Sequence, residues 1–259
     1  MSLHRVSRIA FLVGIFVAIV SLFAVAKREI VLADTPLTAA QYRADPALML
    51  EAYSHVEVAS VSDAMEQLLH EKRYLSHRMQ AIFPTKFAGR ALTVQLVKQE
   101  NHDPGALDGM LQAIDAGGRG SVYVMQVQDG ADIAGMGGLM GTAMSSRGFA
   151  GAVIDGGVRD VPQLQRIRFP VYATGQVPST SVGHYRFVGS NIPVVCDGVR
   201  VEADDIIAAD QDGVVVVPKE NAADVLVLAQ KLDDTEHSMY PYIERLHSIE
   251  EAVKHFGRI

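Results

Sequence analysis

The sequence contains no tryptophan and a single cysteine, Cys196, among its 259 residues. One thiol cannot form an internal disulfide or a multi-thiolate metal site, so disulfide scaffolds and cysteine-based zinc folds are both excluded. Cys196 follows an apolar run that starts at Ile192. Because a catalytic thiolate needs an electropositive neighbourhood, and the sequence shows none there, we expect a buried, unreactive side chain.

An excess of positive charge is also missing. There are 23 Lys and Arg residues against 30 Asp and Glu, a net charge of −7, which excludes nucleic acid as the expected partner. No Gly-x-Gly-x-x-Gly follows a strand pattern and no Gly-Lys-Ser phosphate loop occurs, so no nucleotide cofactor is indicated. With 49% hydrophobic and 20% charged residues the chain can bury a core, which excludes a disordered protein.

The first 33 residues have the pattern of a targeting segment. Arg5 and Arg8 precede an uncharged apolar stretch, residues 9–26, as in a secretory signal peptide. Small-residue cleavage patterns end at Ala26 and Ala33. The alternative is an uncleaved membrane anchor, since eighteen apolar residues reach the lower limit for spanning a bilayer. We therefore expect an exported protein, periplasmic or secreted, or one anchored to a membrane through this segment alone.

The remaining chain alternates helix and strand patterns, which predicts one α/β domain over residues 34–234 followed by a C-terminal helix within residues 235–259. Helices are expected at residues 37–53, 62–69, 104–116, 137–146, 160–167 and 235–256. Strands are expected at residues 89–97, 121–127, 150–154, 171–174 and 214–217, with hairpin turns at Asp197-Gly198 and Asp212-Gly213.

Three features that suit a ligand site coincide between Gly135 and Asp160. Glycines precede a predicted helix, whose free N–H groups can hold a carboxylate or phosphate. A strand then ends in a predicted turn at residues 155–157, where α/β folds place ligands. Arg159 offers a fork of donors for a carboxylate, and Asp160 offers an oxygen ligand for a hard divalent cation. The alternative is an Arg-Asp surface turn in which Asp160 only caps a helix.

These motifs resemble one known family. Residues 137–143 and 151–160 are similar to the regulator of ribonuclease activity A family, which includes the 4-hydroxy-4-methyl-2-oxoglutarate aldolases and was once misnamed demethylmenaquinone methyltransferase. Supporting matches occur at residues 61–64, at Pro104-Gly105 and at residues 209–218. The resemblance covers roughly residues 55–233, with its motifs in order throughout.

The resemblance implies a swivelling-type β/β/α domain that assembles as a trimer or a dimer of trimers, with sites at subunit interfaces. It implies that Asp160 holds Mg²⁺ or Mn²⁺ and that Arg159 contacts the substrate and steadies an enolate. It places the substrate carboxylate on the backbone amides of Gly137, Gly138, Leu139 and Met140. The implied function is that of a metal-dependent lyase that releases pyruvate from small 2-oxo dicarboxylic acids, as an aldolase, an oxaloacetate decarboxylase or both. A divalent ion beside an arginine also suits the charge that develops on the keto oxygen.

One departure supports a second hypothesis. The aldolases commonly carry an acidic residue 21 positions before the arginine, where this chain has Gly138. Aldol cleavage loses a base or metal-water partner there, whereas decarboxylation needs only the ion and Arg159. The alternative function is a non-catalytic binding or regulatory protein on the same fold.

Other titratable residues carry weaker signals. His102 and His184 are candidate bases in loops, but solvated loop histidines are more common. Asp210 and Asp212 resemble an acidic pair of the family, although Asp212-Gly213 is explained as a turn. The terminal histidines His237, His247 and His255 show no metal-ligand spacing and are expected at the surface.

Overall fold

The computed structural model describes residues 36–258. The predicted signal or anchor segment over residues 1–33 lies outside this range. Within the described range, no helix combines the length and the apolar character needed to cross a membrane.

A mixed sheet of nine strands forms the centre of the described chain, in the order β1-β6-β5-β3-β2-β10-β11 with β4 beside β5 and β7 beside β2. Its parallel part consists of β2 (Phe87–Lys98), β3 (Ser121–Val127), β5 (Gly151–Val158), β6 (Val171–Gln176) and β4 (Ala134–Met136). Antiparallel strands flank it: β1 (Gln80–Ala81), β7 (Tyr185–Ser190), β10 (Ile206–Asp210) and β11 (Gly213–Val217). A separate hairpin joins β8 (Val194–Cys196) to β9 (Val199–Val201).

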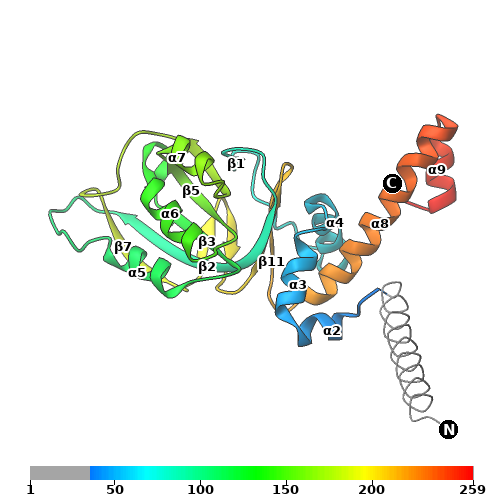
Figure 1. Cartoon of the computed structure of the whole chain (residues 1–259), viewed down its shortest axis with the longest axis horizontal. Coiled ribbons are helices and arrows are strands. Elements are labelled where there is room, and N and C mark those ends of the chain that lie inside the picture. The colour runs from blue at the N-terminus through cyan, green and yellow to red at the C-terminus, as the bar shows by residue number, and fades with distance from the viewer. Residues whose placement is uncertain (1–35, 259) are drawn as a thin grey trace, which may run out of the picture. The chain divides into compact units, whose positions relative to one another are not determined.

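Three helices cover one face of the sheet: α5 (Asp108–Ala116), α6 (Gly138–Ser146) and α7 (Val161–Arg166) (Figure 1). Their apolar side chains, among them Met110, Met144 and Leu164, pack into one buried cluster with Tyr123 and Ile154 of the sheet. The β8–β9 hairpin and the β10–β11 pair form a second cluster with side chains from the other face, including Val124 and Val153. The parallel strands are therefore buried on both faces, as such sheets require.

A helical group packs beside the β10–β11 pair: α2 (Ala39–Ala44), α3 (Pro46–Tyr53), α4 (Val58–Leu69), α8 (Ala222–Leu246) and α9 (Ile249–Phe256). Figure 1 shows α3 and α4 against α8, and α4 also contacts β11. The buried Tyr53 hydroxyl donates to the Ala222 carbonyl oxygen at 2.6 Å, which ties α3 to the start of α8.

Several predicted elements are confirmed. The strand at residues 121–127 and the hairpin turn at Asp197-Gly198 are present. The second hairpin is also present, but its turn is Gln211-Asp212, one residue earlier than predicted, because Gly213 already pairs with Asp210. The Cys196 side chain is fully buried, and this burial raises the pKa of its thiol well above the usual value. The mixed α/β class and a C-terminal helical segment are likewise observed.

Other predicted boundaries are wrong for local reasons. The helix expected over residues 37–53 is two helices, because Asp45 accepts the N–H groups of Ala47 and Leu48 and so starts a new helix at Pro46. The helix expected over residues 235–256 is also two, since His247 has a left-handed backbone and ends α8.

Two further boundaries move near the predicted site. α5 begins at Asp108, four residues after the predicted start at Pro104, because residues 104–107 form turns. β5 continues to Val158 through the predicted turn at residues 155–157, where pairing with β4 and β6 extends it. Glycine is required at these two strand positions, because a Cβ at Gly156 would lie 3.0 Å from Val127 and a Cβ at Gly157 would lie 2.4 Å from Val177.

Candidate active site

The end of β5 places Arg159 and Asp160 beside the start of α6. β4 runs parallel to β5, and the Arg159 N–H donates to the Met136 carbonyl oxygen at 3.0 Å. The chain leaves β4 at Gly137 and enters α6 at Gly138. Two segments that are more than twenty residues apart therefore meet at the carboxyl edge of the sheet, where ligand sites of α/β folds lie.

Asp160 is fixed by its backbone and by its carboxylate. Its backbone is left-handed, with φ of 56°, a conformation that aspartate tolerates better than most residues. Its Oδ2 accepts the Gly138 N–H at 2.9 Å. A Cβ at Gly137 would lie 2.8 Å from this oxygen. Gly137 thus leaves the space that the Asp160 carboxylate occupies.

Arg159 is held at its far end and remains accessible. Its Nη1 donates to the Ser179 carbonyl oxygen at 3.0 Å, and its Nε lies 3.9 Å from Asp160 Oδ2. The Ser179 hydroxyl accepts the Ala134 N–H, which anchors the segment after β6 to β4. The Arg159 side chain is 43% exposed, so its remaining donors can meet a ligand.

Both side chains line a cavity of about 300 Å³. Gly137, Leu139 and Met140 form one wall. The rest of the lining comes from the turn before α5, from α5 itself and from the segment before β7, including Asp103, Asp108, Leu111, Val182 and Gly183. The volume suits a small organic acid, since ligand cavities in proteins begin at about this size.

The structure divides the four predicted backbone donors into two groups. The Gly138 N–H is already engaged by Asp160, and Gly137 precedes the helix. Leu139 and Met140 lie in the first turn of α6, where N–H groups have no acceptor within the helix. Both residues line the cavity, so their amides are the candidate anion donors of this helix end.

A larger acidic side chain does not fit at position 138 without movement. A Cβ there would lie 3.1 Å from the Asp160 Cβ and 3.0 Å from the Gln163 Cγ. Two other carboxylates face the same cavity, those of Asp103 and Asp108. The Gly105 N–H, followed by Arg186, holds the pKa of Asp103 below its usual value, whereas the Asp108 carboxylate has no hydrogen-bond partner within residues 36–258.

The remaining sequence candidates are dispersed. His184 Nδ1 lies 2.9 Å from a Glu100 oxygen, and His102 is exposed and does not line this cavity. Asp210 holds the Val58 N–H at 2.9 Å and the Asp212 N–H at 3.0 Å. The acidic pair therefore organises the start of α4 and the β10–β11 turn.

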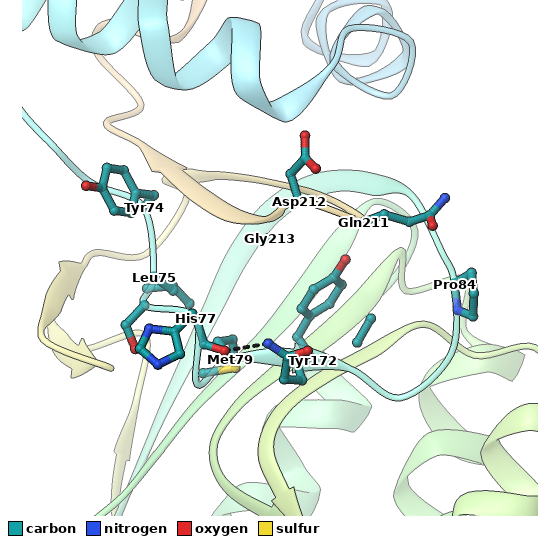
Figure 2. Close-up of a pocket in the computed structure, with 12 residues that line it drawn as sticks. Tyr74, Leu75, His77, Met79, Pro84, Tyr172, Gln211, Asp212 and Gly213 are labelled. Atoms are coloured by element: carbon teal, nitrogen blue, oxygen red, sulfur yellow. Dashed lines mark hydrogen bonds between the residues drawn. The ribbon is translucent and has the colours of Figure 1, made fainter.

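A second cavity, of about 590 Å³, lies between residues 74–84 and the β10–β11 turn (Figure 2). Tyr172 points into it and donates its hydroxyl to the Asp210 carbonyl oxygen. Burial, followed by the nearby carboxylates, raises the pKa of Tyr172 to about 12. Among residues 36–258, no arginine or lysine lines this larger cavity, in contrast to the Arg159 cavity.

Sequence reasoning missed two groups. Asp155 is half-buried in β5, where its Oδ2 accepts the Asp197 N–H at 2.8 Å and burial raises the pKa of its carboxyl. His237, expected to lack metal-ligand spacing, lies beside Glu57 and Asp233, with one ligand atom of each within 4.8 Å of the others. The i, i+4 spacing of Asp233 and His237 was readable from the sequence, but the contact with Glu57 was not.

Comparison with known families decides the classification. The sequence profile of the RraA-like family, described as Aldolase/RraA, matches residues 58–216. The chain belongs to this family. The match contains β2 to β10 together with Arg159 and Asp160, and ends before α8. The aldolase/RraA family includes class II pyruvate aldolases and is typically metal-dependent.

Named relatives share part of the chain. A protein of Halalkalibacterium halodurans, provisionally named a 4-hydroxy-4-methyl-2-oxoglutarate aldolase, is 30% identical over 147 residues, 55% of this chain and 65% of its own. An uncharacterized protein of Methanocaldococcus jannaschii is 37% identical over 110 residues, 42% of this chain and 52% of its own. The chain thus spans between half and two thirds of the length of these two curated relatives.

Solved structures support the fold. An uncharacterized protein from Pseudomonas syringae pv. tomato has a TM-score of 0.71 at 27% identity, covering 84% of this chain and 94% of its own. The Streptomyces coelicolor protein RraAS2, described as an unusual member of the RNase ES inhibitor RraA family, has a TM-score of 0.66 at 25% identity, covering 74% and 94%. The described chain therefore has the mixed α/β fold of the aldolase/RraA family.

Proposed function

We propose that this protein is a divalent-metal-dependent lyase that releases pyruvate from small 2-oxo dicarboxylic acids. The observation that carries the proposal is the cavity where Arg159, Asp160 and the first-turn amides of α6 converge. The name of the Halalkalibacterium halodurans relative supports the same reaction class. The substrates named for testing are 4-hydroxy-4-methyl-2-oxoglutarate and oxaloacetate.

The residues present fit Mg²⁺ or Mn²⁺ at Asp160. One carboxylate oxygen, Oδ2, is occupied by the Gly138 N–H, and Oδ1 has no hydrogen-bond partner within residues 36–258. Mg²⁺ is commonly held by one or two carboxylates and several waters, which matches a single, half-exposed aspartate. When bound, such an ion supplies a Lewis acid for the 2-oxo oxygen of the substrate.

The protein's own groups bind and orient the substrate. The Arg159 guanidinium pairs with the carboxylate or the developing enolate oxygen, and its contact with Ser179 holds it in place. The Leu139 and Met140 amides bind a second carboxylate oxygen at the positive end of α6. In decarboxylation the C3–C4 bond of oxaloacetate breaks, carbon dioxide leaves, the electron pair forms the enolate, and water protonates C3 to give pyruvate.

Aldol cleavage needs a base, because the C4 hydroxyl must lose its proton as the C3–C4 bond breaks. Gly138 cannot supply one. Asp108 also lines this cavity, and its carboxylate lacks a hydrogen-bond partner within the described residues. We therefore expect decarboxylation to be the faster of the two reactions.

The test is pyruvate release from each substrate by the purified full chain, after removal of metal with a chelator and again after addition of Mg²⁺ or Mn²⁺. Metal-dependent release above the rate of an equal concentration of Asp160→Asn protein supports the proposal. Release from neither substrate would contradict both activities and favour a non-catalytic binding or regulatory protein, for which Gly138 is the motivating observation.

We also propose that a second copy of the chain covers the cavity. Leu139, Val182 and Leu111 line it and are 89%, 66% and 47% exposed. Large exposed apolar side chains around a site are typical of an interface. Light scattering on the purified protein should give a trimer or hexamer, and a monomer at micromolar concentration would contradict the proposal.

Export remains part of the proposal because of the pattern in residues 1–33. Cell fractionation should place the protein outside the cytoplasm or in the membrane fraction, and recovery in the cytoplasm alone would contradict it.

A further inference from the structure

A histidine and two carboxylates meet where the start of α4 reaches the middle of α8. Glu57 immediately precedes α4, while Asp233 and His237 lie four residues apart on α8. His237 Nε2 lies 3.5 Å from Glu57 Oε1, and His237 Nδ1 lies 3.6 Å from Asp233 Oδ2. All three residues lie outside residues 58–216, the part matched by the family profile, and outside the Arg159 cavity.

The imidazole is oriented in the manner of a metal ligand. His237 Nδ1 lies 2.9 Å from the Asp233 carbonyl oxygen, so this nitrogen carries the hydrogen and donates it to the helix backbone. The other nitrogen, Nε2, then presents its lone pair toward Glu57. Metal-binding histidines usually donate their second ring N–H to a carbonyl or carboxylate, because that bond fixes the tautomer and the ring plane.

Asp233 is held by groups from the other side of the site. Its Oδ1 accepts the Ser60 hydroxyl at 3.2 Å and the Glu57 N–H at 3.3 Å, and both donors belong to the start of α4. Its Oδ2 lies 3.6 Å from His237 Nδ1 and makes no hydrogen bond within the described residues, and the side chain is only 13% exposed. One ligand is therefore already positioned by Ser60, which is itself buried.

The surroundings favour a cation and allow it to enter. Asp210 accepts the Val58 N–H, so its carboxylate lies at the same end of α4 as that of Glu57. A cavity of about 440 Å³ lined by Glu57, Asp210 and Asp212 opens beside the site. One lysine, Lys86, also lines this cavity, but its Nζ is directed to the His55 carbonyl oxygen at 3.3 Å.

We propose that Glu57, Asp233 and His237 bind a transition-metal dication of the zinc type, with water as the fourth ligand. Two ligand atoms each about 2.0–2.1 Å from a tetrahedral Zn²⁺ lie about 3.3–3.4 Å apart. The 3.5 Å contact between His237 Nε2 and Glu57 Oε1 matches that spacing before any ion contracts the site, and one ligand atom of each of the three residues lies within 4.8 Å of the others. A nitrogen ligand selects against Mg²⁺, which prefers oxygen ligands, so this site differs from the one proposed at Asp160.

The ion would join α4 to α8 across 176 residues of sequence and so stabilise the packing of these two helices within the helical group. Binding to the folded state alone raises Tm, by about 5–10 °C for a domain of this size when the free ion exceeds its Kd a hundredfold. The site would be separate from the one proposed for the lyase reaction, since no group of the Arg159 cavity belongs to it.

The experiment is Zn²⁺ titration of the chelator-treated full chain, by calorimetry and by thermal unfolding, with Co²⁺ absorption spectra as a test of tetrahedral coordination. Wild type should bind one Zn²⁺ at this site. His237→Gln and Glu57→Gln should each weaken it at least tenfold and abolish the Tm rise. Matched controls are His102→Gln, an exposed loop histidine, and Asp160→Asn, and both should retain the site.

Three results would overturn the proposal. Absence of Zn²⁺ binding at about 100-fold excess over protein would leave the three residues as a histidine–carboxylate ion pair only. Binding that persists in both His237→Gln and Glu57→Gln would place the ion elsewhere. Loss of the Tm rise in Asp160→Asn would assign the ion to the Arg159 cavity. Circular dichroism of each variant confirms that its fold is retained before the titrations are compared.

Discussion

Replacing Asp160 with asparagine separates the charge of this side chain from its structural role. Asparagine tolerates the left-handed backbone at this position, where φ is 56°. Its amide oxygen can still accept the Gly138 N–H, which Oδ2 now accepts at 2.9 Å. The substitution therefore removes a negative charge and a metal ligand while the local geometry is kept.

Asparagine and alanine at position 160 should lower the free energy of unfolding by different amounts. Asp160→Asn should lower the free energy of unfolding by less than about 1 kcal/mol, because one hydrogen bond changes from charged to neutral. Asp160→Ala loses that bond, about 1 kcal/mol, and also places alanine in the left-handed region, at a further cost of about 1 kcal/mol. Both variants should lower metal-dependent turnover on the order of a hundredfold or more, by comparison with removal of one preorganised electrostatic group.

The assay is pyruvate release from oxaloacetate with saturating Mg²⁺, together with urea unfolding of the same samples. We expect equal losses of turnover in the two variants and unequal losses of stability. Near-wild-type turnover in folded Asp160→Asn would refute the assignment of the metal to Asp160. A loss of turnover in alanine alone would show that Asp160 acts by positioning Gly138 and not by its charge.

Three further predictions use neighbouring groups. Arg159→Lys keeps the charge but loses the planar fork, so kcat should fall on the order of a hundredfold with less effect on KM; an effect on KM alone would be evidence against a role in the transition state. Gly137→Ala should reduce turnover because its Cβ would lie 2.8 Å from Asp160 Oδ2, whereas Gly118→Ala, with its nearest neighbour at 3.9 Å, should leave turnover unchanged; equal turnover in both variants would contradict the packing argument. Burial raises the pKa of Asp155, so its charged form destabilises the folded chain at pH 7 and Asp155→Asn should raise Tm there. The gain in Tm should disappear below about pH 4, where the carboxyl is protonated in both the folded and the unfolded chain. A gain in Tm that does not depend on pH would exclude burial of the charged carboxylate as its cause.

The sequence predicts the elements with strong local signals. Apolar strand patterns locate β3 and β11, and Asp-Gly pairs locate both hairpins, because these signals are encoded within a few residues. The Arg159-Asp160 pair is likewise found at a sheet edge beside a glycine-led helix. Here local sequence and tertiary structure agree.

Features that depend on distant partners escape such reasoning. The turn expected at Asp155 is a strand, because pairing with β4 and β6 outweighs the turn preference of its glycines. α4 begins at Val58 instead of Ser62, since Asp210 and Asp233 bind the N–H groups of Val58 and Glu57 from other elements. The approach of His237 to Glu57 depends on the same long-range packing of α4 on α8.

The most direct test of the central claim is a crystal structure of the full assembly with Mn²⁺ and oxalate, a stable mimic of the pyruvate enolate. The anomalous signal of manganese locates the ion independently of the ligand. The account predicts manganese within bonding distance of an Asp160 carboxylate oxygen and an oxalate carboxylate paired with the Arg159 guanidinium. Manganese and oxalate bound away from both residues, with the Arg159 cavity empty, would contradict it.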